Sequence, residues 1–119
     1  MLQSHEIAGR QPALAILLTE APRDDVRGAA ARRLVQALQR SARGLPAVYF
    51  YADAVTIPGD VAAAARWAAL GPLDLAACPA AAERRGVDLA VQRTELRVEP
   101  LGLTAWLDRV LDADRVIRL

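Results

Sequence analysis

Residues 73–87 read LDLAACPAAAERRGV, and this stretch predicts a strand that passes directly into a helix. The run 73–77 is short and apolar, as expected of a buried strand. Pro79 suits the first helical position, because its missing N–H would have no partner there. Gly86 is a typical stop signal for the helix. Cys78 is therefore predicted to lie at the N-cap of that helix.

Cys78 is the single cysteine of the chain. At a helix N-terminus its sulfur would lie beside free backbone N–H groups and the positive end of the helix dipole. Such a position stabilises a thiolate or a terminal persulfide anion, and thiolates are the reactive form of cysteine. An intramolecular disulfide is impossible, which favours a reducing, cytoplasmic location. We take Cys78 as the candidate catalytic residue.

Apolar segments alternate in type along the rest of the chain. Strands are expected at residues 13–19, 47–51, 73–77 and 114–118, with a possible further strand around 95–98. Helices are expected at residues 24–43, 61–70, 79–85 and 103–111. Residues 53–60 contain Pro58-Gly59 and are expected to form a loop. The alternation predicts an α/β fold, with a mainly parallel sheet covered by helices on both faces.

The first long helix has a predicted cap and a predicted buried stripe. Asp24 or Asp25 precedes the apolar pattern and is expected to cap the helix. Helical spacing places one set of apolar residues on the same stripe: Val26, Ala30, Leu34, Ala37 and Leu38. Trp67 and Trp106 stand at helical positions elsewhere and are expected in the core or an interface.

Length and composition exclude several classes of function. The chain has 119 residues, read as a flexible tail (1–11) and a single domain (12–119). Its net charge is +1, all basic residues are arginine, and only five residues are aromatic, so nucleic-acid binding is not expected. No apolar run has the length of a membrane span. His5 lies alone in the tail and no glycine fingerprint occurs, so neither a metal nor a nucleotide cofactor is expected.

The carboxyl ends of parallel strands form one edge of a sheet, where binding sites gather. Cys78 is predicted at this edge. Further candidates for binding substrate or partner lie at or near it: Glu20, Pro22, Tyr51, Asp53, Pro79, Arg84 and Arg85. Simpler interpretations are turn and capping roles for the acidic residues, a strand position for Tyr51, and a solvated helix end for the two arginines.

The cysteine segment resembles a motif of the DsrE/TusD sulfur-relay proteins, the DsrE/DsrF-like family. Its features are Cys78, an alanine-rich turn and then Arg84-Arg85-Gly86 with an aliphatic residue. Other segments are also similar: the aromatic strand 48–51 followed by Asp53 and Val55, Arg66-Trp67, Leu101-Gly102-Leu103, and residues 112–116. The similarity covers residues 12–119, and the cysteine motif is its most specific part.

The resemblance implies a sulfurtransferase without cofactor, in which Cys78 carries a persulfide between donor and acceptor proteins. It also implies an α/β/α fold with a five-stranded parallel sheet, and a trimer or hexamer of identical or paralogous subunits. The pathway would be either sulfur oxidation or synthesis of tRNA 2-thiouridine. The chain departs from the family pattern at residues 21–24, at Pro79 and in two shortened loops, after Asp53 and between Val87 and Leu101. The shortened loops favour a stand-alone homo-oligomer or a divergent member.

Two other functions fit the same residues. In the first, Cys78 is inert and the chain is a structural or regulatory subunit of an oligomer. In the second, Cys78 is a redox sensor that oxidises and condenses with an external thiol, because the chain has no second cysteine to resolve the product.

Overall fold

The computed structural model describes residues 13–40, 44–91 and 94–119. The predicted tail and the last three residues of the first predicted helix lie outside these ranges. The described elements are β1 (Leu14–Leu18), α2 (Val26–Gln39), β2 (Ala47–Phe50), the 3₁₀ helix η1 (Ala52–Gly59), α3 (Val61–Ala68), β3 (Asp74–Ala77), α4 (Pro79–Arg84), β4 (Glu99–Pro100), α5 (Leu103–Arg109) and β5 (Arg115–Arg118).

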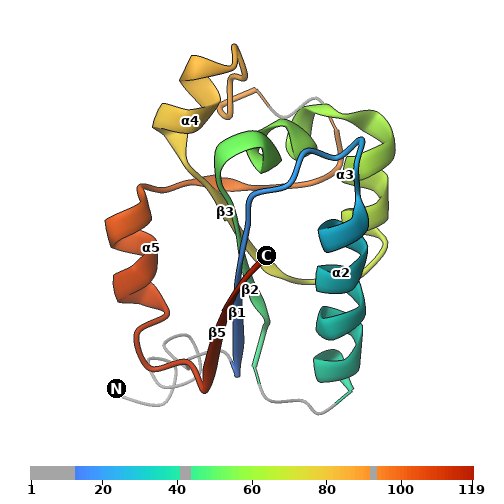
Figure 1. Cartoon of the computed structure of the whole chain (residues 1–119), viewed down its shortest axis with the longest axis vertical. Coiled ribbons are helices and arrows are strands. Elements are labelled where there is room, and N and C mark those ends of the chain that lie inside the picture. Colours follow the sequence, from blue (N-terminus) through green and yellow to red (C-terminus); the bar gives the residue numbers. More distant parts are fainter. Residues whose placement is uncertain (1–12, 41–43, 92–93) are drawn as a thin grey trace.

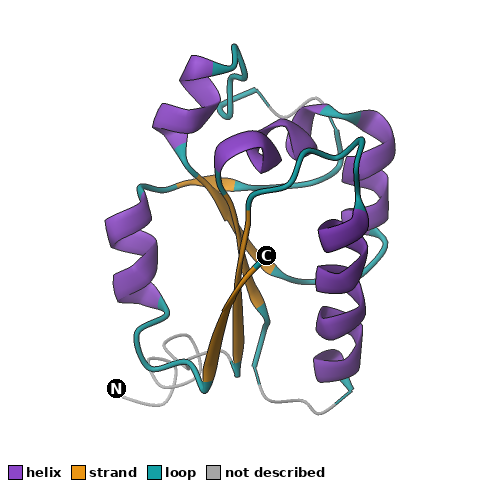
Figure 2. Ribbon diagram, viewed as in Figure 1, coloured by secondary structure: helices purple, strands orange, loops and turns teal. Residues whose placement is uncertain are grey.

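The five strands form one parallel sheet in the order β4-β3-β2-β1-β5. Connections between parallel strands are right-handed, so connections that lead in the same direction place their helices on the same face. Figure 1 shows α2 and α3 on one face of the sheet and α5 on the other, because the chain returns past β1 to form β5. The predicted three-layer α/β/α fold is confirmed, and Figure 2 shows the strands between the helical layers.

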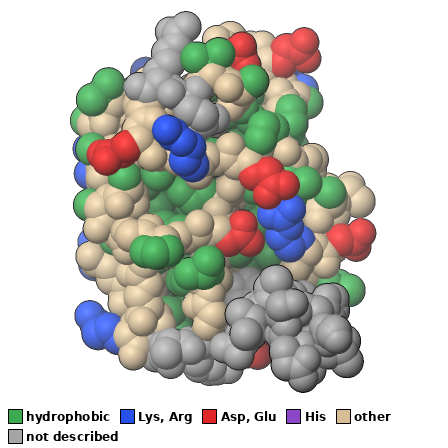
Figure 3. Space-filling view, turned by 180° about the vertical axis from the view of Figure 1, so that it is seen from behind, with side chains coloured by type: hydrophobic (Ala, Val, Ile, Leu, Met, Phe, Trp, Pro, Cys, Tyr) green, Lys and Arg blue, Asp and Glu red, His purple; other side chains and the backbone are tan. Residues whose placement is uncertain are grey.

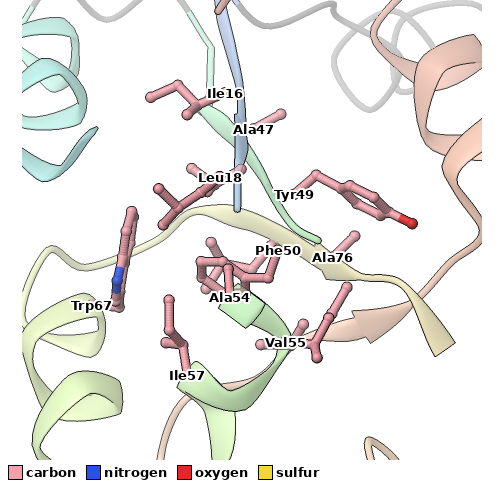
Figure 4. Close-up of a cluster of buried hydrophobic side chains, with 14 of the residues drawn as sticks. Ile16, Leu18, Ala47, Tyr49, Phe50, Ala54, Val55, Ile57, Trp67 and Ala76 are labelled. Carbon is pink, nitrogen blue, oxygen red and sulfur yellow. The ribbon is translucent and has the colours of Figure 1, made fainter. Parts of the chain in front are cut away.

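Adjacent aromatic residues of β2 point to opposite faces of the sheet, as strand geometry requires. Phe50 meets Trp67 of α3 edge-on, with ring centroids 5.4 Å apart. Tyr49 stacks on Trp106 of α5, with centroids 4.9 Å apart. Figure 4 shows Phe50 and Trp67 within the apolar cluster and Tyr49 pointing away from them. Both tryptophans are buried, which confirms their predicted place in the core.

The predicted buried stripe of α2 is wrong, although its last member, Leu38, does pack against the core and is partly buried. The helix buries Gly28, Ala31 and Val35, whereas Val26 is 73% exposed and Leu34 is 38% exposed. The larger apolar side chains dominated the sequence pattern. In the structure the smaller residues face the sheet, and small side chains let a helix approach its neighbours closely.

The expected loop at 53–60 is instead the 3₁₀ helix η1, spanning Ala52–Gly59. The hydroxyl of Thr56 donates to the carbonyl of Asp53 at 2.8 Å, which supports the tight turn. Val55 and Ile57 are buried against the core. Pro58-Gly59 does end the segment, but burial of the apolar residues before it orders the backbone into helical turns.

The possible strand at 95–98 is displaced. Strand pairing begins only at β4, where Glu99 and Pro100 pair with the last two residues of β3. Leu96 and Val98 are buried without belonging to a strand. Their apolar character therefore reflects packing and not strand pairing.

Within the described residues, no helix combines the length and apolar character needed to cross a bilayer.

An arginine of α5 holds two acidic side chains of the sheet. Arg109 donates to both carboxylate oxygens of Glu99, at 2.8 and 3.0 Å, and lies 3.5 Å from the carboxylate of Asp74. The hydrogen bonds from Arg109 lower the pKa of Glu99. Burial raises the pKa of Asp74 although Arg109 opposes this shift, and Glu99 adds to it. The cluster ties α5 to the edge of the sheet formed by β3 and β4.

Candidate functional site

The carboxyl ends of three strands meet at one edge, as the sequence predicted. The backbone N–H of Tyr51 donates to the carbonyl of Leu18 at 2.9 Å, which joins the ends of β2 and β1. The N–H of Cys78 donates to the carbonyl of Phe50 at 3.2 Å, which joins the ends of β3 and β2. Cys78 therefore lies at the carboxyl-end edge of the sheet, directly after β3 and directly before α4.

Cys78 is the N-cap residue of α4, and Pro79 is its first residue, which confirms both predictions. The Cys78 backbone is extended, with φ −76° and ψ 117°. Its sulfur accepts a hydrogen bond from the N–H of Ala81 at 3.5 Å. Cys78 is only 7% exposed. The sulfur thus has one backbone donor in place and little contact with solvent.

Tyr49 is a site residue that the sequence interpretation missed. Its side chain is fully buried, and its hydroxyl donates to the carbonyl of Leu101 at 2.7 Å. Burial and a hydrogen-bonding interaction with the side chain of Cys78 raise the pKa of Tyr49. The N–H of Leu101 in turn donates to the carbonyl of Ala77 at 3.0 Å, so the hydroxyl lies in the same small network as the cysteine.

The strand register, which the sequence alone does not give, explains why Tyr49 belongs to this site. Tyr49 is the register partner of Ala76 in the parallel ladder, and Cys78 follows two residues later on an extended backbone. Residues two apart in a strand share a face. The candidate Tyr51 lies two residues beyond Tyr49, is half-buried, and stacks on it with ring centroids 6.2 Å apart.

Three of the predicted site residues line one hollow beside the cysteine helix. The guanidinium of Arg85 lies 2.9 Å from the carboxylate of Asp53 and also donates to the carbonyl of Ala81 at 3.0 Å. The hollow has a volume of about 370 Å³ and is lined by Ala21, Pro22, Arg23, Asp53, Thr56, Asp60 and Arg85. The structure therefore brings the first loop, η1 and the end of α4 together.

Glu20 caps α2 in place of the predicted aspartates. One of its carboxylate oxygens accepts hydrogen bonds from the N–H groups of Arg27 at 2.7 Å and Gly28 at 3.1 Å. Asp25 occupies the N-cap position, but its side chain makes no cap hydrogen bond and its φ is 46°. Asp24 likewise precedes the helix without capping it in the hydrogen bonds of the described residues. The predicted capping by an Asp24 or Asp25 side chain is therefore wrong, because the capping carboxylate belongs to Glu20, in the loop after β1.

The remaining candidates lie on α4. Pro79 is exposed and lines a second, largely apolar hollow of about 650 Å³, between α4, the segment 86–90 and Pro100. Arg84 is exposed at the last position of α4, where the helix dipole favours a cation. The two arginines thus differ, since only Arg85 turns toward η1 in the contacts described above.

Metal-ligating and charged side chains were compared across the described residues. No group of three or more His, Cys, Asp or Glu side chains in the described parts of the chain could hold a metal ion. Figure 3 shows acidic and basic side chains intermixed with apolar ones on the face seen from behind. The chemistry that the described site offers is that of a thiol with nearby hydrogen-bond donors.

A protein-family comparison decides the relationship of this chain to known proteins. The model of the DsrE/DsrF-like family matches residues 13–119. The chain belongs to the DsrE/DsrF-like family. This family is associated with sulfur transfer, and its members work in sulfur-relay complexes. The predicted resemblance of the chain to this family is thereby confirmed.

A solved structure has the same fold. The crystal structure of the YchN protein from E. coli is similar with a TM-score of 0.69 and 20% sequence identity, over 92% of this chain and 100% of that one. At this level of identity the likeness concerns the fold alone. No curated protein sequence matches this chain significantly.

Proposed function

We propose that this DsrE/DsrF-like chain is a sulfurtransferase subunit that carries sulfane sulfur as a persulfide on Cys78. The observation that carries the proposal is the position of the Cys78 sulfur. It lies at the end of β3, accepting a hydrogen bond from Ala81, in a chain whose family is associated with sulfur transfer. A backbone N–H directed at sulfur stabilises an anion there more than it stabilises a neutral thiol.

The proposed cycle has two balanced steps. The Cys78 thiolate attacks the outer sulfur of a donor persulfide, a new S–S bond forms, and the donor S–S bond breaks to release the donor thiolate. An acceptor thiolate then attacks the outer sulfur of the Cys78 persulfide, and Cys78 leaves as a thiolate. The sulfane sulfur is transferred without net oxidation, so no cofactor is required.

Donor and acceptor are proposed to be proteins of a sulfur relay, in either sulfur oxidation or tRNA thiolation, in a reducing cytoplasm. The hollow lined by Pro22, Asp53 and Arg85 supports a contact surface beside the cysteine helix. Four other residues at or near this edge are also proposed to contact substrate or partner: Glu20, Tyr51, Pro79 and Arg84.

Exposed apolar side chains support an oligomer, either a homo-oligomer or an assembly with paralogous subunits, in the size range of a trimer or hexamer. Leu107, Leu111 and Val116 are 45%, 75% and 51% exposed on α5, just after it, and on β5. Surface patches of this kind are often covered in an assembly. Light scattering coupled to gel filtration, with and without candidate partners, measures the subunit number.

One observation favours a second candidate function. Cys78 is only 7% exposed, and buried cysteines are more often small core residues than nucleophiles. A structural or regulatory subunit with an inert Cys78 would have this property. In the persulfide carrier, by contrast, the sulfane sulfur would lie about 2 Å beyond the Cys78 sulfur, which is the length of an S–S bond. This outer sulfur is the atom that a partner has to reach.

Intact-mass measurement tests the proposal. The purified protein is incubated with polysulfide, with Cys78→Ser as the matched control. The expected result is a gain of one sulfur atom that reductant reverses and that the serine variant lacks. No gain, together with slow alkylation of native Cys78, would contradict the proposal and favour the structural subunit. A sulfenate or mixed disulfide formed with peroxide, without sulfur uptake, would favour the redox sensor.

A further inference from the structure

The sheet places the side chains of Tyr49 and Cys78 on the same face, on neighbouring strands. Tyr49 pairs with Ala76, and Cys78 lies two residues beyond Ala76 on an extended backbone. Both side chains therefore leave the sheet on the same face, on neighbouring strands. The acceptor of the Tyr49 hydroxyl, Leu101, donates its own N–H to the carbonyl of Ala77, the residue before Cys78.

The ring of Tyr49 has little freedom to move. It is fully buried and stacks on two other rings, with centroid distances of 4.9 Å to Trp106 and 6.2 Å to Tyr51. Its hydroxyl is anchored on the carbonyl of Leu101 at 2.7 Å. The hydroxyl oxygen is therefore fixed in position, so only the O–H proton has to turn for this group to donate to another acceptor.

We propose that Tyr49 is a catalytic residue of sulfur transfer, whose hydroxyl donates a hydrogen bond to the Cys78 sulfur as that sulfur becomes an anion. This inference rests on the proposed function. It concerns the discharge step, in which the bond between the Cys78 sulfur and the sulfane sulfur breaks and the electron pair stays on Cys78. The phenol has a single O–H proton, and in the resting arrangement it donates this proton's hydrogen bond to the carbonyl of Leu101. During discharge it turns to the sulfur, because a hydrogen bond to a charged acceptor is stronger than one to a neutral carbonyl.

Cyanide is a suitable probe, since it removes the outer sulfur as thiocyanate and leaves Cys78 as the thiolate. Wild-type and Tyr49→Phe proteins are loaded with polysulfide, and thiocyanate release is followed with time. We expect Tyr49→Phe to discharge about ten-fold or more slowly, which is the effect of losing a hydrogen bond to a charged group.

Thr19→Val is the matched control. Thr19 also donates its hydroxyl to a backbone carbonyl, that of Leu119 at 3.1 Å, at the end of the neighbouring strand β1. A general effect of losing a hydroxyl that donates to a backbone carbonyl would slow both variants equally, and this outcome would overturn the role of Tyr49. Discharge of Tyr49→Phe at the wild-type rate would overturn it as well. Slow discharge confined to Tyr49→Phe supports it.

Two further measurements separate the causes of failure. If wild-type protein takes up no sulfur, the proposed function falls, and the catalytic role of Tyr49 falls with it. If wild-type protein loads normally, the discharge rates test Tyr49 alone.

Replacement of Tyr49 by 3-fluorotyrosine keeps the ring and makes the hydroxyl a stronger donor, so it covers the case in which Tyr49→Phe fails to fold. Faster discharge of this variant supports the proposal, and an unchanged rate overturns it.

Discussion

Asp25 and Arg32 form a bidentate pair across the first turns of α2. The two guanidinium nitrogens donate to the two carboxylate oxygens at 2.9 and 2.8 Å. Arg66 of α3 adds a contact of 3.5 Å to the same carboxylate. Arg32 also lies over the ring of Trp67, 5.8 Å from its centroid. Asp25 therefore joins α2 to α3 instead of capping a helix, and this pairing leads to the first two predictions.

The Asp25 pair predicts a pH-dependent stability. Hydrogen bonds and charge from Arg32 lower the pKa of Asp25 in the folded protein below its ordinary value of 3.8. The stabilisation is therefore present above pH 3.8 and is lost as the pH falls through the lower folded value. Asp25→Asn, which tolerates the positive φ, should lower the unfolding free energy by about 1 kcal/mol at neutral pH. Urea titrations should show the two proteins converging in acid; an equal difference at every pH would contradict this explanation.

Gly28 should not show the usual gain from a glycine-to-alanine change in a helix. An added Cβ would lie 2.6 Å from a carboxylate oxygen of Asp25, which Arg32 holds in place. Gly28→Ala normally stabilises a helix by about 1 kcal/mol, but here it must displace the pair. We expect no gain or a loss in the wild-type background. In an Asp25→Gly background, which removes the obstructing side chain and suits the positive φ, the same change should be stabilising. Thermal unfolding of the four proteins tests this, and equal effects in both backgrounds would exclude the clash.

Asp74 predicts a pH trend of the opposite sign. Burial raises its folded pKa above the ordinary value of 3.8. A carboxyl with a raised pKa favours folding while it is protonated, and this contribution is lost as the pH rises from 3.8 through the folded value. Asp74→Asn should therefore become more stable relative to wild type as the pH rises. The gain should stay below about 1 kcal/mol, because the side chain is partly exposed and Arg109 opposes the shift. A relative stability that falls with rising pH would show that the ion pair with Arg109 dominates.

The corrected register of α2 can be tested with two neighbouring residues. Val35 is fully buried, whereas Leu34 is 38% exposed although the sequence pattern placed it on the buried stripe. Val35→Ala should destabilise the protein by about 1.5 to 2.5 kcal/mol, from two lost methyl groups and the cavity they leave. Leu34→Ala should change stability by no more than about 0.5 kcal/mol. Chemical denaturation of both variants gives the comparison, and the reverse order of effects would restore the predicted stripe.

Local patterns in the chain were enough to predict the fold and the place of Cys78. The alternation of strand-length and helix-length apolar segments implied a parallel sheet with helices on both faces, because connections between neighbouring parallel strands require a crossover. Pro79 directly after Cys78 predicted the N-cap, since that preference involves adjacent residues only. The motif around Cys78 also carried the family resemblance.

Contacts between distant segments were decided only by the tertiary structure. The cap of α2 comes from Glu20, seven residues before the N–H of Arg27 that it accepts from, and the expected loop before α3 became η1 when its apolar residues were buried. The hydroxyl of Tyr49 meets a carbonyl 52 residues away, that of Leu101, and so lies in the network around Cys78. Periodicity and capping rules describe neighbours along the chain, whereas these contacts depend on how strands are ordered in the sheet. The sequence by itself therefore determined the candidate residue, Cys78, and its place at a helix N-cap, whereas the packing of β2, β3 and the segment before α5 decided which side chains surround it.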